Sequence, residues 1–137
     1  MRRQTGTGES ENYLVMGNYL LNDRVVPAMD QAWRASAGRQ FEDRLMDTAL
    51  AARDAGGDMA GHRSSGILVH DADGYPRTDL RIDFAPRREG LPDAVDQLKA
   101  AVEAWKPMIP YFKARPSTPD MPGWMDWLKA QGTPYRD

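Results

Sequence analysis

Apolar and polar residues alternate strictly in the middle of the chain. Three apolar side chains alternate with three charged ones, namely Leu80, Ile82 and Phe84 with Asp79, Arg81 and Asp83. Because successive side chains of a strand point to opposite faces, this stretch predicts a strand with one row on a core and one charged row opposite.

A second strand is predicted over residues 64–69, which end in the apolar run Ile67 to Val69. An unbroken apolar run of this length is typical of a strand buried on both faces. Gly74 and Pro76 lie between the two strands and favour a turn. The pattern therefore predicts a β-hairpin with a loop over residues 71–77.

The N-terminal part of the chain predicts a strand and two helices. Residues 1–12 are polar and indicate a flexible arm, whereas the apolar residues 13–16 indicate a strand. Asp23 is expected to cap a first helix, with Pro27 in its first turn and Gly38 as its stop. Its buried stripe is Val25, Val26, Met29 and Trp33. A second helix is expected over residues 39–53, with Phe41, Leu45, Ala49 and Ala52 on one face.

The C-terminal part predicts a third helix and a proline-rich tail. Pro92 is expected to open the helix, whose apolar face is Val95, Leu98, Val102 and Trp105. Six of the ten prolines follow from Pro107 onward, which indicates an extended tail with one short helix over residues 124–131. Trp124, Trp127 and Leu128 would then dock on the chain's own core or on another subunit.

The order of elements favours an α+β fold, because strands and helices segregate into layers. Three strands would form a small antiparallel sheet with open edges. Two parts are expected, a domain over residues 1–105 and a Pro/Trp-rich extension over residues 106–137. A net charge of −2 gives no support to a nucleic-acid surface, which would be basic, and the absence of cysteine excludes disulfides and thiolate sites. Neither a membrane span nor a signal peptide is present, so a cytoplasmic protein is expected.

Several residues are candidates for chemistry, and each has a plainer structural interpretation. The row of Asp79, Arg81 and Asp83 is either the polar wall of a pocket or, more simply, a solvated face. Gly56 and Gly57 either end a helix or let a ligand approach the backbone beside Asp58. His62 and His70 lack a third metal ligand, so surface histidines and no metal site are expected. Ser64 and Ser65 are interpreted as the start of a strand, since no nucleophile motif surrounds them.

Three segments taken together resemble a protein family, domain-of-unknown-function family 1028. They are YLVMGNYLLNDRVVPAM, AGGDMAGHRSSGILV and DLRID, and the likeness covers about residues 5–84. The resemblance implies the fold of the N-terminal-nucleophile hydrolases, an αββα sandwich of two antiparallel sheets between helix layers. It also implies that this chain corresponds to the C-terminal half of the family. The chain departs from the family pattern at Met16 and Arg63, where the family carries glutamine.

The resemblance also implies a function and a set of site residues. In such hydrolases an N-terminal Thr or Ser is the nucleophile, and its α-amine is the general base. Here that residue would belong to a missing N-terminal half or to an oligomeric partner, and the substrate would be a small amide without a cofactor. The alternative is a non-catalytic binding or assembly module of the same fold. The implied catalytic residues are Asn18 and Asp58, and the implied substrate-binding residues are Gly57, Arg63, Ser64, Asp79 and Arg81.

Overall fold

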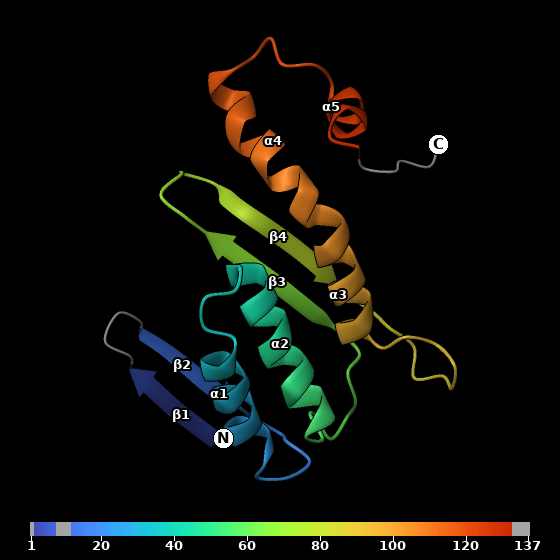
Figure 1. Cartoon of the computed structure of the whole chain (residues 1–137). Coiled ribbons are helices and arrows are strands. Elements are labelled where there is room, and N and C mark those ends of the chain that lie inside the picture. The colour runs from blue at the N-terminus through green and yellow to red at the C-terminus, as the bar shows by residue number, and fades with distance from the viewer. Residues whose placement is uncertain (1, 8–11, 133–137) are drawn as a thin grey trace.

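The structure, a computed structural model, describes residues 2–7 and 12–132, and its strands form two separate hairpins (Figure 1). Strands β1 (Arg2–Thr7) and β2 (Asn12–Gly17) pair antiparallel, as do β3 (Ser65–His70) and β4 (Pro76–Ile82). The expected α+β class is confirmed. The expected single three-stranded sheet is wrong, because β2 does not pair with either strand of the second hairpin.

The predicted flexible arm over residues 1–12 is wrong for residues 2–7, which form β1. The strand pairs with β2 in continuous register from Arg2 opposite Gly17 to Thr7 opposite Asn12. Backbone hydrogen bonds build this ladder, so a polar sequence without an apolar pattern can still form it. Residues 1 and 8–11 of the predicted arm lie outside the described residues.

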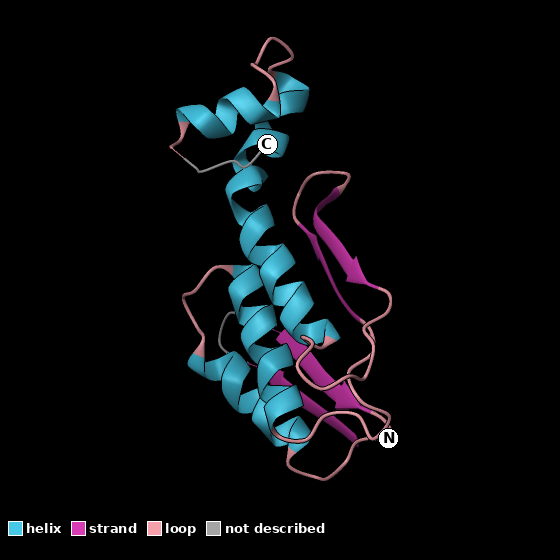
Figure 2. Ribbon diagram, turned by 90° about the vertical axis from the view of Figure 1, so that its right-hand side faces the viewer, coloured by secondary structure: helices cyan, strands magenta, loops and turns pink. Residues whose placement is uncertain are grey.

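Helices cover one side of both hairpins and leave the other side of the strands uncovered (Figure 2). Helix α1 (Val25–Ala35) packs on β1 and β2, and α3 (Ala94–Trp105) packs on β3 and β4. Helix α2 (Phe41–Asp54) contacts α1, α3 and β3 and so joins the two hairpins. None of the described helices is long and apolar enough to cross a bilayer.

The main core lies between α2, α3 and the second hairpin. Its buried members are Met46, Ile67, Val69, Val95, Leu98 and Val102. Leu80 and Ile82 pack against it, which confirms the predicted apolar row of β4, but Phe84 lies beyond the strand and is exposed. Strand β3 is buried on one face only, since Leu68 is 58 % exposed, so the prediction of burial on both faces is wrong.

The helix boundaries differ from the predictions at their caps. Asp23 does not cap α1, because the N-cap position is Arg24, whose backbone N–H is bonded to the Asn22 side chain at 2.9 Å. Asp93 caps α3 by accepting hydrogen bonds from the backbone N–H groups of Val95 and Asp96, both at 2.9 Å. Pro92 therefore precedes the helix.

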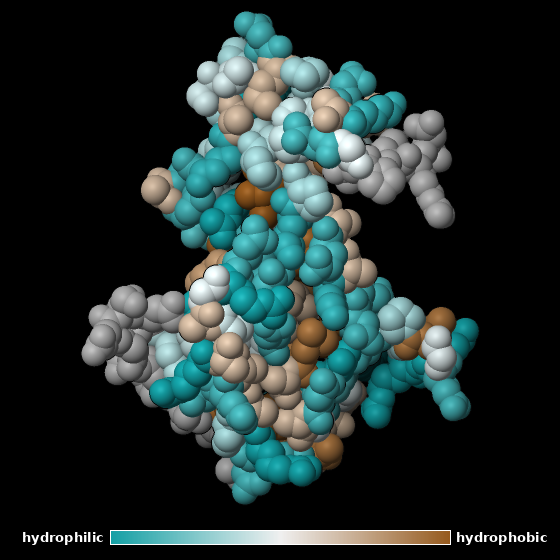
Figure 3. Space-filling model, viewed as in Figure 1, coloured by the Kyte–Doolittle hydropathy of each residue, from teal (hydrophilic) through white to brown (hydrophobic). Residues whose placement is uncertain are grey.

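The tail is helical rather than extended. A 3₁₀ turn η1 (Lys106–Met108), helix α4 (Ile109–Ala114), a second turn η2 (Arg115–Ser117) and α5 (Trp124–Ala130) follow α3. Pro107, Pro110 and Pro116 each stand in the first two positions of a helix, where a missing N–H costs little. Leu128 of α5 packs with Met108 and Tyr111, so the tail forms a small core of its own. Figure 3 shows a mostly polar surface with scattered apolar patches.

Trp33 is central to the packing of α1, and replacing it by Ala should lower the free energy of unfolding by about 3–5 kcal/mol. The residue is 7 % exposed, and its ring lies 5.6 Å from Tyr13, 5.7 Å from Phe41 and 3.9 Å from the Arg44 guanidinium carbon. Urea titration measures the loss. Trp124→Ala, at a side chain 40 % exposed, is the matched control and should cost about 1 kcal/mol or less. An equally small loss for Trp33→Ala would contradict this packing.

An ion pair between Asp71 of the hairpin loop and Lys113 of α4 should make the stability of the fold depend on pH. The Lys113 Nζ atom lies 2.6 Å from Asp71 Oδ2 and lowers the pKa of Asp71 to about 2. A lowered carboxyl pKa stabilises the fold above the unfolded-state value near 4, and this stabilisation is lost as pH falls through about 2. The Tm difference between wild type and Asp71→Asn should therefore shrink between pH 6 and pH 2.5. Adding Lys113→Met to Asp71→Asn should cause little further loss at pH 6, and full additivity would exclude the coupling.

Candidate functional site

Two segments that the sequence singled out lie side by side at the end of β2. The loop of residues 17–22 runs next to residues 55–59, which follow α2. The Leu21 N–H donates to the Gly57 carbonyl at 2.9 Å, and the Met59 N–H donates to the Tyr19 carbonyl at 3.0 Å. Leu20 and Asp58 thus form an antiparallel bridge. The segment that carries Asn18 is therefore held to the segment that carries Asp58.

Backbone geometry at this pairing requires glycine. Gly56 and Gly57 have φ values of +125° and +56°, a region that side chains disfavour. A Cβ atom on Gly56 would lie 2.5 Å from the Asn22 amide nitrogen, which donates to the Ala55 carbonyl at 2.8 Å. Tyr19 also has a positive φ, +56°, without being glycine. Such strained residues persist only where the surrounding contacts hold them, and they concentrate at functional sites.

His62 packs directly against Gly57. A Cβ atom on Gly57 would lie 1.9 Å from His62 Nε2, so the imidazole occupies the space that a side chain would need. The Nδ1 atom lies 3.5 Å from Asp93 Oδ2 at the start of α3. The Nε2 atom is buried without a hydrogen-bond partner. The expectation of a surface histidine is confirmed for His70, which is exposed, and is wrong for His62, which links the glycine loop to α3.

A polar cleft of about 440 Å³ opens beside these loops. Asp58 lies at its wall, with Oδ1 accepting from the Ala60 N–H at 2.6 Å, and Arg87 donates to the Ala60 carbonyl at 3.3 Å. The cleft offers both carboxylate and guanidinium groups to a small polar molecule. Its lining residues are Leu21, Gly56, Asp58, Met59, Gly61, His62, Ala85, Pro86, Arg87, Arg88, Leu91 and Asp93.

The other expected site residues are not among those that line this cleft. Asn18 is exposed in the paired loop, and Gly57 is buried. Arg63 and Ser64 are exposed just after it, with the Arg63 guanidinium carbon 5.4 Å from the centre of the Phe84 ring.

Asp79 and Arg81 lie on the exposed face of β4. Arg81 pairs with Asp83 at 3.0 Å, and both side chains are more than 70 % exposed. The structure therefore places these charges on a solvated face of the strand, which was the simpler of the two interpretations.

Sequence reasoning missed His62, Arg87 and Asp93 as lining residues. His62 has no motif around it, and its neighbour Asp93 comes from the start of a later helix, so only the fold brings them together. The available signal was the cluster of glycines at positions 56, 57 and 61. Across the described ranges, no group of three His, Cys, Asp or Glu side chains could hold a metal ion.

The comparisons with known proteins give one positive result. A family model described as "Family of unknown function (DUF1028)" matches residues 2–89, the N-terminal part of this chain. No curated protein and no solved structure matches the chain. The match contains both paired loops and both hairpins, whereas all of α3 and the helical tail lie outside it. Since the matched residues make up more than half of the sequence, the chain belongs to the DUF1028 family.

Proposed function

We propose that this chain is one part of a hydrolase that cleaves small amide or peptide-like bonds, and that a second polypeptide segment supplies the nucleophile. One observation carries the proposal: backbone hydrogen bonds hold the Asn18 loop against the Gly56–Asp58 loop beside an open polar cleft. The strained Tyr19 and the two positive-φ glycines lie at the same place. The resemblance to the family also supports the proposal, because it implies the αββα fold of the N-terminal-nucleophile hydrolases with this chain as its C-terminal half.

Three buried hydroxyl groups of the described part of the chain are already committed to hydrogen bonds within the fold. Thr48 donates to the Arg44 carbonyl at 2.8 Å, Thr78 to the Glu42 carboxylate at 3.0 Å and Ser36 to the Trp33 carbonyl at 3.0 Å. All three are buried and serve the packing of helices and strands. An N-terminal Thr, Ser or Cys on the second segment would instead carry its own base, the α-amine.

In the proposed reaction, the nucleophile attacks the amide carbonyl and its proton passes through the α-amine to the leaving nitrogen. The C–N bond breaks, the amine departs, and water then hydrolyses the acyl-enzyme to the acid and the free nucleophile. The Asn18 side-chain amide would donate to the oxyanion of the tetrahedral intermediate. Asp58 would bind the amine side of the substrate, and Gly57 would allow close approach of the backbone. Arg63 and Ser64 would contact the distal part of the substrate.

The alternative function is a non-catalytic assembly module of the same fold. The helical tail favours it, because Trp124 and Met125 remain at least 40 % exposed although Leu128 and Tyr111 are buried beside them. Exposed aromatic and methionine side chains are frequent at protein interfaces. The assembly module requires the tail for its contacts with other subunits, whereas the hydrolase does not.

Replacing Asn18 by Ala in the complete assembly should lower kcat by about 10²–10³-fold, as for loss of one oxyanion donor. Asp58→Asn should mainly raise KM, because it keeps the hydrogen bond to Ala60 but removes the charge. Steady-state kinetics on a small amide substrate measures both effects. Glu103→Gln, on the exposed side of α3, is the control. Unchanged kinetics in both test variants would exclude the catalytic assignment.

Deleting residues 107–137 should leave the number of chains in the assembly unchanged if the chain acts as part of a hydrolase, so the native mass should fall only by the mass of the deleted residues. The deletion removes Met108, Tyr111 and Leu128 together, so no half of the tail core is left behind. Light scattering with size-exclusion chromatography measures the mass, and circular dichroism verifies the fold. Loss of the assembly with the fold retained would favour the module instead.

A further inference from the structure

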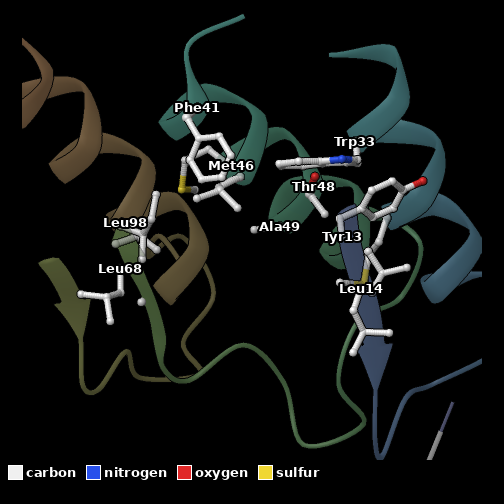
Figure 4. Close-up of a pocket in the computed structure, with 14 residues that line it drawn as sticks. Tyr13, Leu14, Trp33, Phe41, Met46, Thr48, Ala49, Leu68 and Leu98 are labelled. Atoms are coloured by element: carbon white, nitrogen blue, oxygen red, sulfur yellow. The ribbon is translucent and has the colours of Figure 1, made fainter. Parts of the chain in front are cut away.

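An apolar groove of about 650 Å³ separates the two hairpins, with α2 as its floor (Figure 4). Tyr13, Leu14 and Val15 of β2 line one side, and Gly66, Ile67 and Leu68 of β3 line the other. None of the residues that line the groove carries a charge. A groove of this volume is large enough for a small molecule, so volume alone does not identify its occupant.

The strands on both sides of the groove are edge strands. Strand β2 is bonded to β1 alone, and β3 to β4 alone, so each presents an unpaired backbone edge toward the groove. Leu14 and Leu68 are 42 % and 58 % exposed on these edges. Long, apolar, uncovered edges are sites at which further strands add. These edges favour an extended polypeptide over a small molecule, because only a strand satisfies a row of backbone donors and acceptors.

The face of α2 that points into the groove is also apolar and only partly covered. Phe41, Leu45 and Ala49 form the apolar face that the sequence predicted, and all three line the groove. Phe41 is 44 % exposed, and the helix buries polar Glu42 and Arg44 elsewhere. An apolar helix face normally packs on a sheet. Here the two hairpins flank that face but leave its centre uncovered.

The direction of the strands limits what can fill the gap. Figure 1 shows β2 and β3 running in opposite directions. Because neighbours in an antiparallel sheet alternate in direction, an even number of added strands joins β2 to β3. The smallest such unit is one hairpin. Six residues in each added strand would match the lengths of β2 and β3.

The printed sequence does not contain this hairpin. The residues that the structure does not describe are residue 1, residues 8–11 and residues 133–137. Five residues reach at most roughly 18 Å, and they follow α5 at the opposite end of the molecule from the first hairpin (Figure 1). The occupant is therefore not part of the same copy of this chain.

We propose that a β-hairpin from the segment that supplies the nucleophile inserts between β2 and β3 and completes one continuous antiparallel sheet. Alternate side chains of the inserted strands are apolar and pack on Phe41, Leu45 and Ala49, because the groove offers them no charged partner. The partner's identity rests on the proposed function, whereas the place of insertion rests on the groove and its edges. Insertion also brings the partner beside β2, the strand that leads into the Asn18 loop.

Site-specific photo-cross-linking in the source organism tests the insertion. Leu14→p-benzoylphenylalanine and Leu68→p-benzoylphenylalanine place the reactive group on the two edges. Tyr75→p-benzoylphenylalanine, at the exposed hairpin loop, is the control. Irradiation should link both edge positions, but not position 75, to neighbouring strands of one polypeptide segment outside the 137 residues. A link within one longer chain supports the proposal equally. No link at either edge, equal linking at position 75, or links to a second copy of these 137 residues would overturn it.

Charge substitutions give an independent measurement. The partner chain is the polypeptide that carries the cross-linked segment. Leu14→Asp and Leu68→Asp should each reduce, at least about tenfold, the amount of partner chain that copurifies with this protein, whereas Tyr75→Asp should not. Melting temperatures of the isolated variants show whether the fold is kept. Recovery that stays unchanged in folded Leu14→Asp and Leu68→Asp would overturn the insertion. If both edges link to a segment that does not begin with Thr, Ser or Cys, the insertion stands and the proposed function fails.

Discussion

Neither hairpin of this protein is stable alone, because a two-stranded hairpin in water buries too little apolar surface. The fold therefore depends on α2, which contacts α1 above the first hairpin and β3 of the second. Buried polar contacts fix its orientation. Glu42, 3 % exposed, accepts from Arg77 at 2.9 Å and from Thr78 at 3.0 Å, both on β4. On the other side, Arg44 stacks on Trp33 and donates to its carbonyl at 3.2 Å. Leaving either charge without its partners would be costly.

This arrangement explains why the apolar face of α2 lies over a groove. With Glu42 facing β4 and Arg44 facing α1, the side chains of Phe41, Leu45 and Ala49 line the space between the hairpins. The same orientation of α2 places its C-terminal end so that Gly56 and Gly57 contact the loop after β2. The polar cleft and the apolar groove are thus two consequences of one helix position. They lie along the same strand, β2, which lines the groove and leads into the Asn18 loop.

The candidate site is held by backbone more than by side chains. Leu21 and Met59 donate their N–H groups across the two loops, and the positive φ of Tyr19 is maintained by these bonds. His62 fills the space above Gly57 and connects the loop to the start of α3 through Asp93. A substrate bound at Asp58 would therefore meet a wall whose geometry is set by contacts between four distant stretches of chain. Such a wall is preorganised, and preorganisation is what electrostatic stabilisation of a transition state requires.

The sequence by itself determined the local elements and the segments in which function is expected. The alternation of residues 79–82 specified β4 and its core face, and the spacing of Val95, Leu98 and Val102 specified α3, because local periodicity decides which side is apolar. The glycines at positions 56 and 57 marked a special backbone, since only glycine adopts such φ values readily. Strand β1 was missed because backbone pairing, not an apolar pattern, forms it. The tail was misjudged because Pro107, Pro110 and Pro116 each stand where a helix begins. Only the tertiary structure decided that the strands divide into two hairpins and that His62 meets Asp93. These depend on contacts between residues far apart in the chain, which no local pattern encodes.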